Sequence, residues 1–438
     1  MGNNSPQRPV VVGGGAAGLA ACLTLEAHGH APLLIEASSA LGGRLRTEAL
    51  PDGTPVDVGF QVLQTAYPEL RRWVDLEALD VVPFIPGAKV HSGGRWRTLA
   101  DPRRAPRLLP ATLTSGIGQW SDRWRMLRLI TALKGHETEA LQQGWFGLCG
   151  RTGAPDGMGQ KDKGRWASVA TSVFLREWGF SPGFIASFLG PFLSGIFLER
   201  ELTTPAAQFH YTFRMLADGG AVRPRQGMVA LVNHLWSKLS RTEVRHGIRV
   251  ERNEQGALLL EGELLAEEGV ILTVPLPGDE RGQVQWKGCL NAVFSTPSSP
   301  FGSAILGLIP TAEWVTNFHF MEDLEGPVGT GRINVTAVLP SPESDPEHGL
   351  KGMTQDLASA GIECNETEWY QWIPHALPVV DEVGAVGNMG SARDGSIPAG
   401  DWTSAPSLDA ALRSGRLAAE AWLRTQARPQ TASGDEAA

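Results

Sequence analysis

A glycine-rich turn between a short strand and a helix constrains this chain more than any other stretch. Residues 9–12, Pro-Val-Val-Val, have the composition of a parallel strand buried on both faces, and residues 13–18 follow with the spacing Gly-x-Gly-x-x-Gly. Residues 19–28 have the pattern of a helix, and residues 32–35 form a second apolar strand that ends at Glu36. This order predicts a βαβ unit of the Rossmann type and therefore an α/β fold.

The turn also has the features that hold a dinucleotide. Gly13 permits the tight turn, Gly15 lets the backbone approach a pyrophosphate, and Gly18 lets the helix pack close to the sheet. The helix N-terminus offers free N–H groups to phosphates, and Glu36 can accept hydrogen bonds from an adenosine ribose. A glycine-rich turn in an ordinary α/β domain is the alternative, but it does not explain the acid. The predicted contacts in this unit are Gly13, Gly15, Ala16, Ala17, Gly18, Glu36 and Ala37.

The residues after the acid indicate which dinucleotide is bound. Leu41-Gly42-Gly43-Arg44 follows Glu36 closely, and here the sequence resembles the flavin amine oxidase superfamily, which includes monoamine oxidases, protoporphyrinogen oxidases and phytoene-type desaturases. The resemblance implies a Rossmann-type GR2 FAD-binding domain, with Gly42 and Gly43 along the FAD pyrophosphate and Arg44 against phosphate or flavin. A guanidinium suits phosphate oxygens, so the chemistry of this segment agrees with the resemblance.

The same resemblance assigns cofactor contacts in three further segments. The backbone of residues 59–62 would pass the flavin ring, although these residues taken alone also fit a core strand with a turn. The backbone of Val250 would meet the adenine, Asp401 would bind the ribityl chain, and the helix start at Leu408 would face the N1/O2 edge of the flavin. The implied contacts are Gly59, Phe60, Gln61, Val62, Val250, Gly400, Asp401 and Leu408.

With 438 residues the chain is too long for one simple core, so we expect two structural domains. The resemblance implies an FAD-binding domain built from residues 1–75, 223–282 and 375–425. It implies a mixed α+β substrate domain built from the mainly helical residues 76–222 and the strands of residues 283–374. We expect a β-ribbon around residues 92–94, a loop over the glycine-rich residues 147–165, a strand over residues 244–250 and a disordered tail over residues 426–438.

Composition excludes several classes of protein. The formal net charge of −9 disfavours nucleic acid as a partner, and with no signal peptide it favours a cytoplasmic location. The four cysteines are isolated, without a C-x-x-C motif, so we expect no metal site and no redox dithiol. Residues 178–198 carry no charge, but their glycines and prolines favour a wall of the substrate cavity over a membrane span.

Residues 101–130 leave two interpretations open. The stretch is basic, and it carries leucines together with Trp120 and Trp124. Such an amphipathic segment can lie on an anionic membrane surface, which would make the protein a peripheral membrane protein. The alternative is a helical region that packs by its apolar face and leaves its basic face in water.

The predicted chemistry is a two-electron oxidation in which FAD accepts a hydride at N5. An apolar substrate such as a polyene or terpenoid is favoured, since the segment Ala376-Leu377-Pro378 stands where amine oxidases tend to place an aromatic wall. No second nucleotide motif exists, so oxygen or a quinone is the expected electron acceptor. An amine or amino-acid oxidase that releases hydrogen peroxide and a non-redox isomerase are the alternatives. The catalytic residues cannot be assigned from the sequence; the pocket candidates are Lys287, Tyr370, His375 and Trp402.

Overall fold

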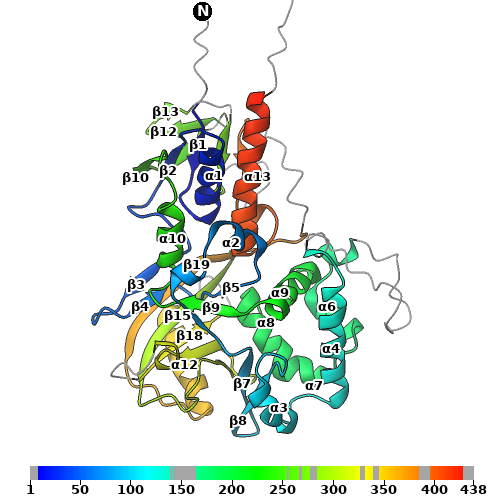
Figure 1. Ribbon diagram of the computed structural model, residues 1–438. Helices are drawn as coiled ribbons and strands as arrows, with labels where there is room; N and C mark the ends of the chain where they lie inside the picture. The colour runs from blue at the N-terminus through cyan, green and yellow to red at the C-terminus, as the bar shows by residue number, and fades with distance from the viewer. Residues whose placement is uncertain are drawn as a thin grey trace, which may run out of the picture.

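The computed structural model describes residues 8–138, 141, 164–253, 255, 257–265, 269–276, 284–325, 331–338, 345–383 and 395–427. A parallel sheet with two long helices occupies one end of the molecule, and a large mixed sheet and a block of helices lie side by side at the other end (Figure 1). Residues 426 and 427, predicted as the start of a tail, belong to helix α13 (Leu408–Ala427). The rest of the predicted tail lies outside the described residues, as do residues 147–163 of the predicted loop.

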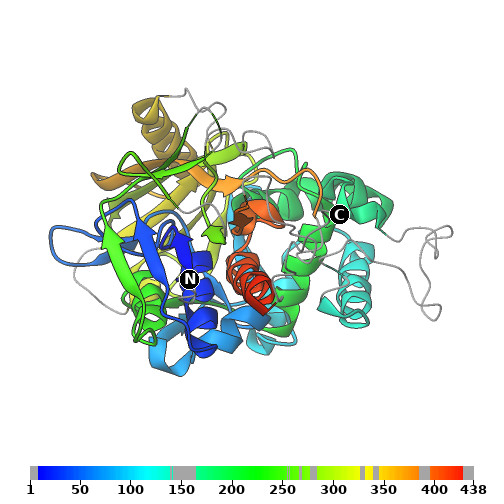
Figure 2. The same cartoon turned by 90° about the horizontal axis from the view of Figure 1, so that it is seen from above.

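The predicted Rossmann-type unit is the centre of a five-stranded parallel sheet. Its order is β10 (Glu243–His246), β2 (Leu33–Glu36), β1 (Val10–Val12), β14 (Val270–Leu272) and β20 (Ile397–Pro398). The central strands β1, β2 and β14 are apolar at almost every position. Because successive side chains of a strand point to opposite faces, both faces of the sheet are apolar there. Helices α1 (Ala16–Ala27) and α13 (Leu408–Ala427) pack together on one face, as Figures 1 and 2 show. The α/β prediction is confirmed.

The other face of this sheet is covered by a small antiparallel sheet of β11 (Val250–Arg252), β12 (Leu258–Leu260) and β13 (Glu263–Leu264). The sequence pattern predicted one strand over residues 244–250, and this was wrong. Gly247 has φ +74 and ends β10 in a turn, so the chain leaves the parallel sheet before β11 begins. Glycine accepts this backbone conformation without strain, which explains the break.

The second sheet has seven strands. Its order is β19 (Thr367–Pro378), β15 (Trp286–Thr296), β18 (Gly331–Ala337), β17 (Val315–Phe320), β16 (Leu306–Leu308), β7 (Gly87–Ser92) and β8 (Arg95–Ala100). Neighbours are antiparallel except β16 and β7. Helix α12 (Pro346–Ser359) packs against this sheet. The ribbon predicted around residues 92–94 is the β7–β8 hairpin.

The helical block consists of α3 (Leu109–Thr114), α4 (Trp120–Lys134), α6 (Thr171–Glu177), α7 (Pro182–Phe184), a π-helical turn at Ile185–Leu189, α8 (Gly190–Phe197) and α9 (Ala206–Asp218). The uncharged residues 178–198 are therefore several short helical pieces, and Gly179 turns the chain with φ +93. Within the part of the chain that the structure describes, no helix has both the length and the apolar character to cross a bilayer.

Short elements connect the two ends of the molecule. They are the hairpin of β3 (Thr47–Ala49) and β4 (Pro55–Asp57), the sheet of β5 (Leu63–Gln64), β9 (Ala221–Pro224) and β6 (Val81–Pro83), and helices α2 (Pro68–Trp73), α10 (Val229–Trp236) and α11 (Glu322–Glu325). A buried ion pair, Arg223 Nε to Asp57 Oδ2 at 2.9 Å, ties β9 to β4. Asp57 also accepts the backbone N–H of Met228 at 2.7 Å, just before α10.

Candidate functional site

The turn between β1 and α1 needs its glycines. Gly13 has φ +99, and a Cβ atom on Gly18 would lie only 1.9 Å from the carbonyl oxygen of Gly13. Among the described residues no side chain caps the N-terminus of α1, and no acidic residue stands in its first turn. The first N–H groups and the positive end of the helix dipole are therefore available to an anion.

Glu36 lies at the end of β2, directly beside this turn. Its Oε2 accepts the N–H of Gly14 at 2.7 Å, and its Oε1 accepts the N–H of Ser38 at 2.8 Å. Both carboxylate oxygens are thus held at the open edge of the sheet, with lone pairs left for further donors. Ala37, the next residue, is exposed, while Val250 is buried in β11 on the neighbouring small sheet.

The segment with Gly42 and Gly43 lies against the turn. Gly42 forms a parallel bridge with Gly15, and the Gly42 N–H donates to the Gly14 carbonyl at 2.9 Å. A Cβ atom on Gly43 would lie 3.4 Å from the Cα of Gly15. The two glycine segments that the sequence places about 27 residues apart therefore form one backbone cradle.

Arg44 joins the first and the last of the predicted cofactor segments. Its Nη1 donates to Asp401 Oδ2 at 2.9 Å, its Nη2 donates to Asp401 Oδ1, and Nη1 also reaches the carbonyl of Ala376 at 3.3 Å. Burial opposes the charge, but the Asp401 carboxylate outweighs it and raises the pKa of Arg44. The guanidinium carbon lies 5.2 Å from the ring centre of Trp286, a contact that the sequence did not reveal.

The segment predicted to pass the flavin ring leaves β4 and lies next to Arg44. Gly59 has φ +92, and Gln61 donates its Nε2 to the carbonyl oxygens of Arg44 at 2.8 Å and Val58 at 2.9 Å. Gln61 thereby supports the Arg44 backbone, and the side chains of Phe60 and Val62 turn toward the substrate side, where they line a cavity.

The start of α13 is fixed by a residue that sequence reasoning missed. Asp409 follows Leu408, and its carboxylate accepts the N–H of Glu69 at 2.8 Å and the hydroxyl of Tyr211 at 2.6 Å. Burial raises the pKa of Asp409, partly offset by these hydrogen bonds. The contacts join the first turn of α13, next to Leu408, to α2 and α9. An acid in the first turn of a helix was the available signal.

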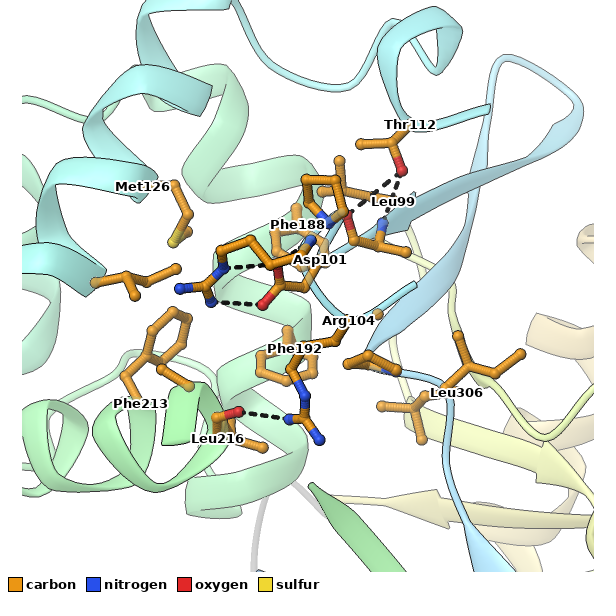
Figure 3. Close-up of a pocket in the computed structure, with 18 of the residues that line it drawn as sticks. Leu99, Asp101, Arg104, Thr112, Met126, Phe188, Phe192, Phe213, Leu216 and Leu306 are labelled. Carbon is orange, nitrogen blue, oxygen red and sulfur yellow. Dashed lines mark hydrogen bonds and ion pairs between the residues drawn. The ribbon is translucent and has the colours of Figure 1, made fainter. Parts of the chain in front are cut away.

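A cavity of about 540 Å³ opens between the helical block and the seven-stranded sheet (Figure 3). Its interior is apolar, and Phe184, Phe188 and Phe192 of the stretch that we interpreted as a cavity wall line it. Charged side chains gather at one part of the lining, where Arg103 binds Asp101 at 2.9 Å and Arg104 donates to the Leu216 carbonyl at 3.0 Å. Members of the apolar lining include Phe60, Val62, Phe84, Leu99, Phe184, Phe188, Phe192, Ile196, Phe213 and Leu306.

The four catalytic candidates lie outside this lining. Lys287 Nζ donates to Glu199 Oε2 and to Thr204 Oγ1, each at 2.8 Å, so it is an ion-paired lysine on β15. Tyr370 is 47% exposed on β19. His375 is exposed and packs at 5.5 Å against the ring of Trp286, while Trp402 is buried beside Gly400. Lys287 and His375 are sequence neighbours of Trp286 and Ala376, the residues of β15 and β19 that contact Arg44.

The sequence matches the family of flavin-containing amine oxidoreductases over residues 16–286, more than half of the chain. The chain belongs to this family. Its cofactor is FAD, and it is a flavin oxidoreductase.

Two curated relatives resemble parts of this flavin oxidoreductase. Carotenoid phi-ring synthase of Chlorobaculum tepidum is 25% identical over 272 residues, which is 60% of this chain and 39% of that protein. An L-amino-acid oxidase of Pseudechis australis is 37% identical over 83 residues, 19% of this chain and 16% of that protein. The chain thus spans well under half the length of either relative.

Solved structures share the fold of this flavin oxidoreductase over nearly its whole length. A putative protoporphyrinogen oxidase of Exiguobacterium sp. 255-15 has a TM-score of 0.66 at 17% identity, covering 96% of this chain and 99% of that one. A fatty acid isomerase of P. acnes that produces CLA has a TM-score of 0.67 at 16% identity, covering 94% and 97%. Putrescine oxidase has a TM-score of 0.65 at 19% identity, covering 95% and 99%. At these identities the likeness concerns the fold.

The residues of the cradle fit the cofactor of the family. An uncapped helix N-terminus and the Arg44 cation suit a diphosphate, and Glu36 and Asp401 offer acceptors for hydroxyl groups. The glycine backbone leaves room for close approach. Hydrogen bonds join the glycine turn to Glu36 and Gly42, and Arg44 to Gln61 and Asp401. The roles of all the predicted cofactor contacts stay proposals.

Proposed function

We propose that this flavin oxidoreductase removes two electrons from a lipophilic small molecule, such as a polyene or terpenoid, in the manner of a desaturase. The observation that carries the proposal is the apolar cavity, because its lining includes Phe60 and Val62. These two residues belong to the segment that the resemblance assigns to the flavin ring. A ligand in this cavity would be shielded from water beside the cofactor. Bound FAD supplies the two-electron acceptor.

The chain's own residues have three roles in this proposal. The glycine cradle and Arg44 would hold the diphosphate, Asp401 would bind the ribityl hydroxyls, and the first turn of α13 would stabilise negative charge on the flavin. The phenylalanines of the cavity orient the substrate and exclude water. Bound FAD would supply the site for a hydride from the substrate, the accompanying proton would pass to solvent, and dioxygen or a quinone would be the final acceptor of the two electrons.

The cavity favours this substrate class over an amine. A cationic amine needs a carboxylate partner or an aromatic cage in its binding site. The acid in the lining, Asp101, is already bound to Arg103, and its pKa is lowered by the hydrogen bonds from Arg103 against the opposing effect of burial. The isomerase alternative uses the same cavity, but in that reaction the substrate transfers no net electrons to an external acceptor.

Anaerobic reduction tests the proposal. The purified protein should show a flavin spectrum and release FAD on denaturation, and an apolar polyene or terpenoid should bleach the flavin while a panel of amines should not. Bleaching by amines with release of hydrogen peroxide would support amine oxidation instead. Substrate turnover by the pre-reduced enzyme without net redox change would support the isomerase. Absence of FAD would reject all three.

We further propose that the cavity opens toward a membrane surface. Five large apolar side chains of α3 and α4 are both exposed and part of the cavity lining: Leu109, Leu113, Trp120, Trp124 and Leu127. Trp120 is 69% exposed and Trp124 is 64% exposed, and the guanidinium of Arg123 lies 4.7 Å from the ring centre of Trp120. Exposed tryptophans flanked by arginines suit the interface of an anionic bilayer, from which a lipophile could enter the cavity directly.

A further inference from the structure

One polar side chain stands out in the apolar wall of the cavity. Gln64 ends the short strand β5 and lines the cavity together with Phe60 and Val62, which lie on the same side of this extended segment. It is only 6% exposed. The register of β5 with β9, where Gln64 faces Ala221, fixes its position.

The amide of Gln64 has no partner in the described part of the chain. Its Oε1 is fully enclosed and accepts no hydrogen bond, and no hydrogen bond engages its Nε2, which is not enclosed. By contrast, the hydroxyl of Thr112, another buried polar group of the lining, accepts the N–H of Ala100 at 3.1 Å. A half-turn about the last side-chain torsion exchanges oxygen and nitrogen, so the amide can present a donor or an acceptor to the cavity.

An amide without a hydrogen-bond partner weakens the binding of any ligand that cannot form a hydrogen bond with it. A hydrocarbon that filled the cavity would displace water from the amide and leave it without any hydrogen bond, whereas a hydroxyl or carbonyl group would satisfy it. Sites for apolar ligands commonly carry a few such polar groups, which fix the orientation of the ligand.

We propose that Gln64 hydrogen-bonds an oxygen-bearing group of the ligand, so that the substrate is an oxygenated lipophile, such as a terpenoid alcohol or ketone, and not a plain hydrocarbon. This inference rests on the proposed function in taking the cavity as the substrate site. It narrows the substrate class, since it separates functionalised terpenoids from unmodified polyenes.

The test compares farnesol with the triene hydrocarbon that lacks only its hydroxyl group. Trp120 and Trp124 line the cavity, so binding can be followed by intrinsic fluorescence without any redox turnover. The measured quantity is the ratio of the two dissociation constants, compared between wild type and Gln64→Met, because this comparison cancels the different solubilities of the ligands. We expect the preference for farnesol to fall at least about fivefold in Gln64→Met.

Leu306→Met is the matched control, since it changes the same lining without changing a polar group, and it should leave the ratio as in wild type. The melting temperature of ligand-free Gln64→Met should not fall, because the amide has no hydrogen bond to lose. An unchanged ratio, or a Gln64→Met protein that fails to fold, would overturn the proposal. If farnesol binds with the expected preference but no lipophile reduces the flavin, the oxidation proposal fails and the role of Gln64 stands.

Discussion

Arg44 and Asp401, which are 357 positions apart in the chain, form a two-pronged ion pair at the centre of the cradle. The pair connects the glycine segment after β2 to the segment after β20. Asp401 is almost completely buried, and the guanidinium is also in contact with Trp286. The geometry of the cradle therefore depends on contacts between distant segments.

Replacing Asp401 with Asn tests this pair. The amide can accept from only one side of the guanidinium, so Arg44 loses its carboxylate partner, and we expect the affinity of the apoprotein for FAD to fall roughly tenfold. Titration of apoprotein with FAD measures it. Glu243→Gln, which removes the partner of Arg8 in an exposed ion pair, is the control and should leave FAD binding unchanged. Equal FAD affinity in Asp401→Asn and wild type would contradict the role assigned to the pair.

Gly18→Ala should disrupt the turn itself. The added methyl group would meet the carbonyl oxygen of Gly13 at 1.9 Å, so α1 must move away from β1. We expect a loss of at least about 2 kcal/mol in the free energy of unfolding and a clear drop in bound FAD. Gly183→Ala in α7 is the control, because no atom outside its own turn of helix lies within 4 Å of the place that the added methyl group would take. A Gly18→Ala protein with normal stability would show that the helix does not need this close approach.

The exposed apolar residues at the cavity mouth predict binding to anionic vesicles. Wild type should partition onto vesicles that contain phosphatidylglycerol and less onto neutral ones, because arginines near the surface each add about 1 kcal/mol. Trp120→Ser combined with Trp124→Ser should reduce partitioning roughly tenfold or more in sedimentation assays. Trp236→Ser alters a tryptophan that is 37% exposed on α10, away from the cavity, and should have little effect. If the wild-type protein binds neither type of vesicle, the proposal that the cavity opens toward a membrane surface is wrong.

His319 should make the stability of the protein depend on pH. Burial, together with the nearby Arg223, lowers the pKa of His319 to about 3, and the ring packs between Phe60 and Phe84. In the unfolded chain His319 has its ordinary pKa of about 6.5 and binds a proton below that pH, whereas in the folded protein it stays neutral down to about pH 3. The free energy of unfolding therefore falls as the pH falls toward 3.

His319→Leu should remove this contribution. From about pH 7.5 to pH 5, the free energy of unfolding should fall by about 2 kcal/mol less in His319→Leu than in wild type. Urea denaturation at both pH values measures this difference. His246→Leu, at an exposed position at the end of β10, is the control and should follow wild type. A His319→Leu protein with the pH dependence of wild type would show that the imidazole ionises freely in the folded state.

The ion pair of Lys287 and Glu199 predicts that the effects of substituting the two residues on stability are strongly coupled. Burial opposes ionisation of Glu199, but Lys287 reverses this effect and lowers the pKa of the carboxyl group. Lys287→Met leaves Glu199 charged and buried, which should destabilise the protein by about 3–5 kcal/mol. The double variant with Glu199→Gln should recover most of the loss. If Lys287 also acts on the flavin, the double variant will fold normally yet reduce its flavin more slowly, which separates catalysis from stability.

Much of the cofactor cradle could be predicted because its signals are local. The spacing of Gly13, Gly15 and Gly18 follows from close contacts over a short stretch of chain, and the acid of Glu36 ends the next strand. Parallel strands buried on both faces give continuous apolar runs, which made β1, β2 and β14 recognisable. The prediction of a single strand over residues 244–250 was wrong because Gly247 turns the chain, so that the residues before and after it join different sheets. No local sequence pattern indicates which sheet each part joins.

By itself, the sequence determined the Rossmann-type unit, the family resemblance and the cofactor, since these depend on residue types at fixed short spacings. Only the tertiary structure decided that Arg44 meets Asp401, that Lys287 is bound by Glu199 and that Asp409 anchors α13. It also decided that Gln64 faces the cavity without a hydrogen-bond partner among the described residues. Such contacts join segments that are dozens to hundreds of residues apart. Their geometry depends on how the sheets and helices pack, and no short-range pattern encodes that packing.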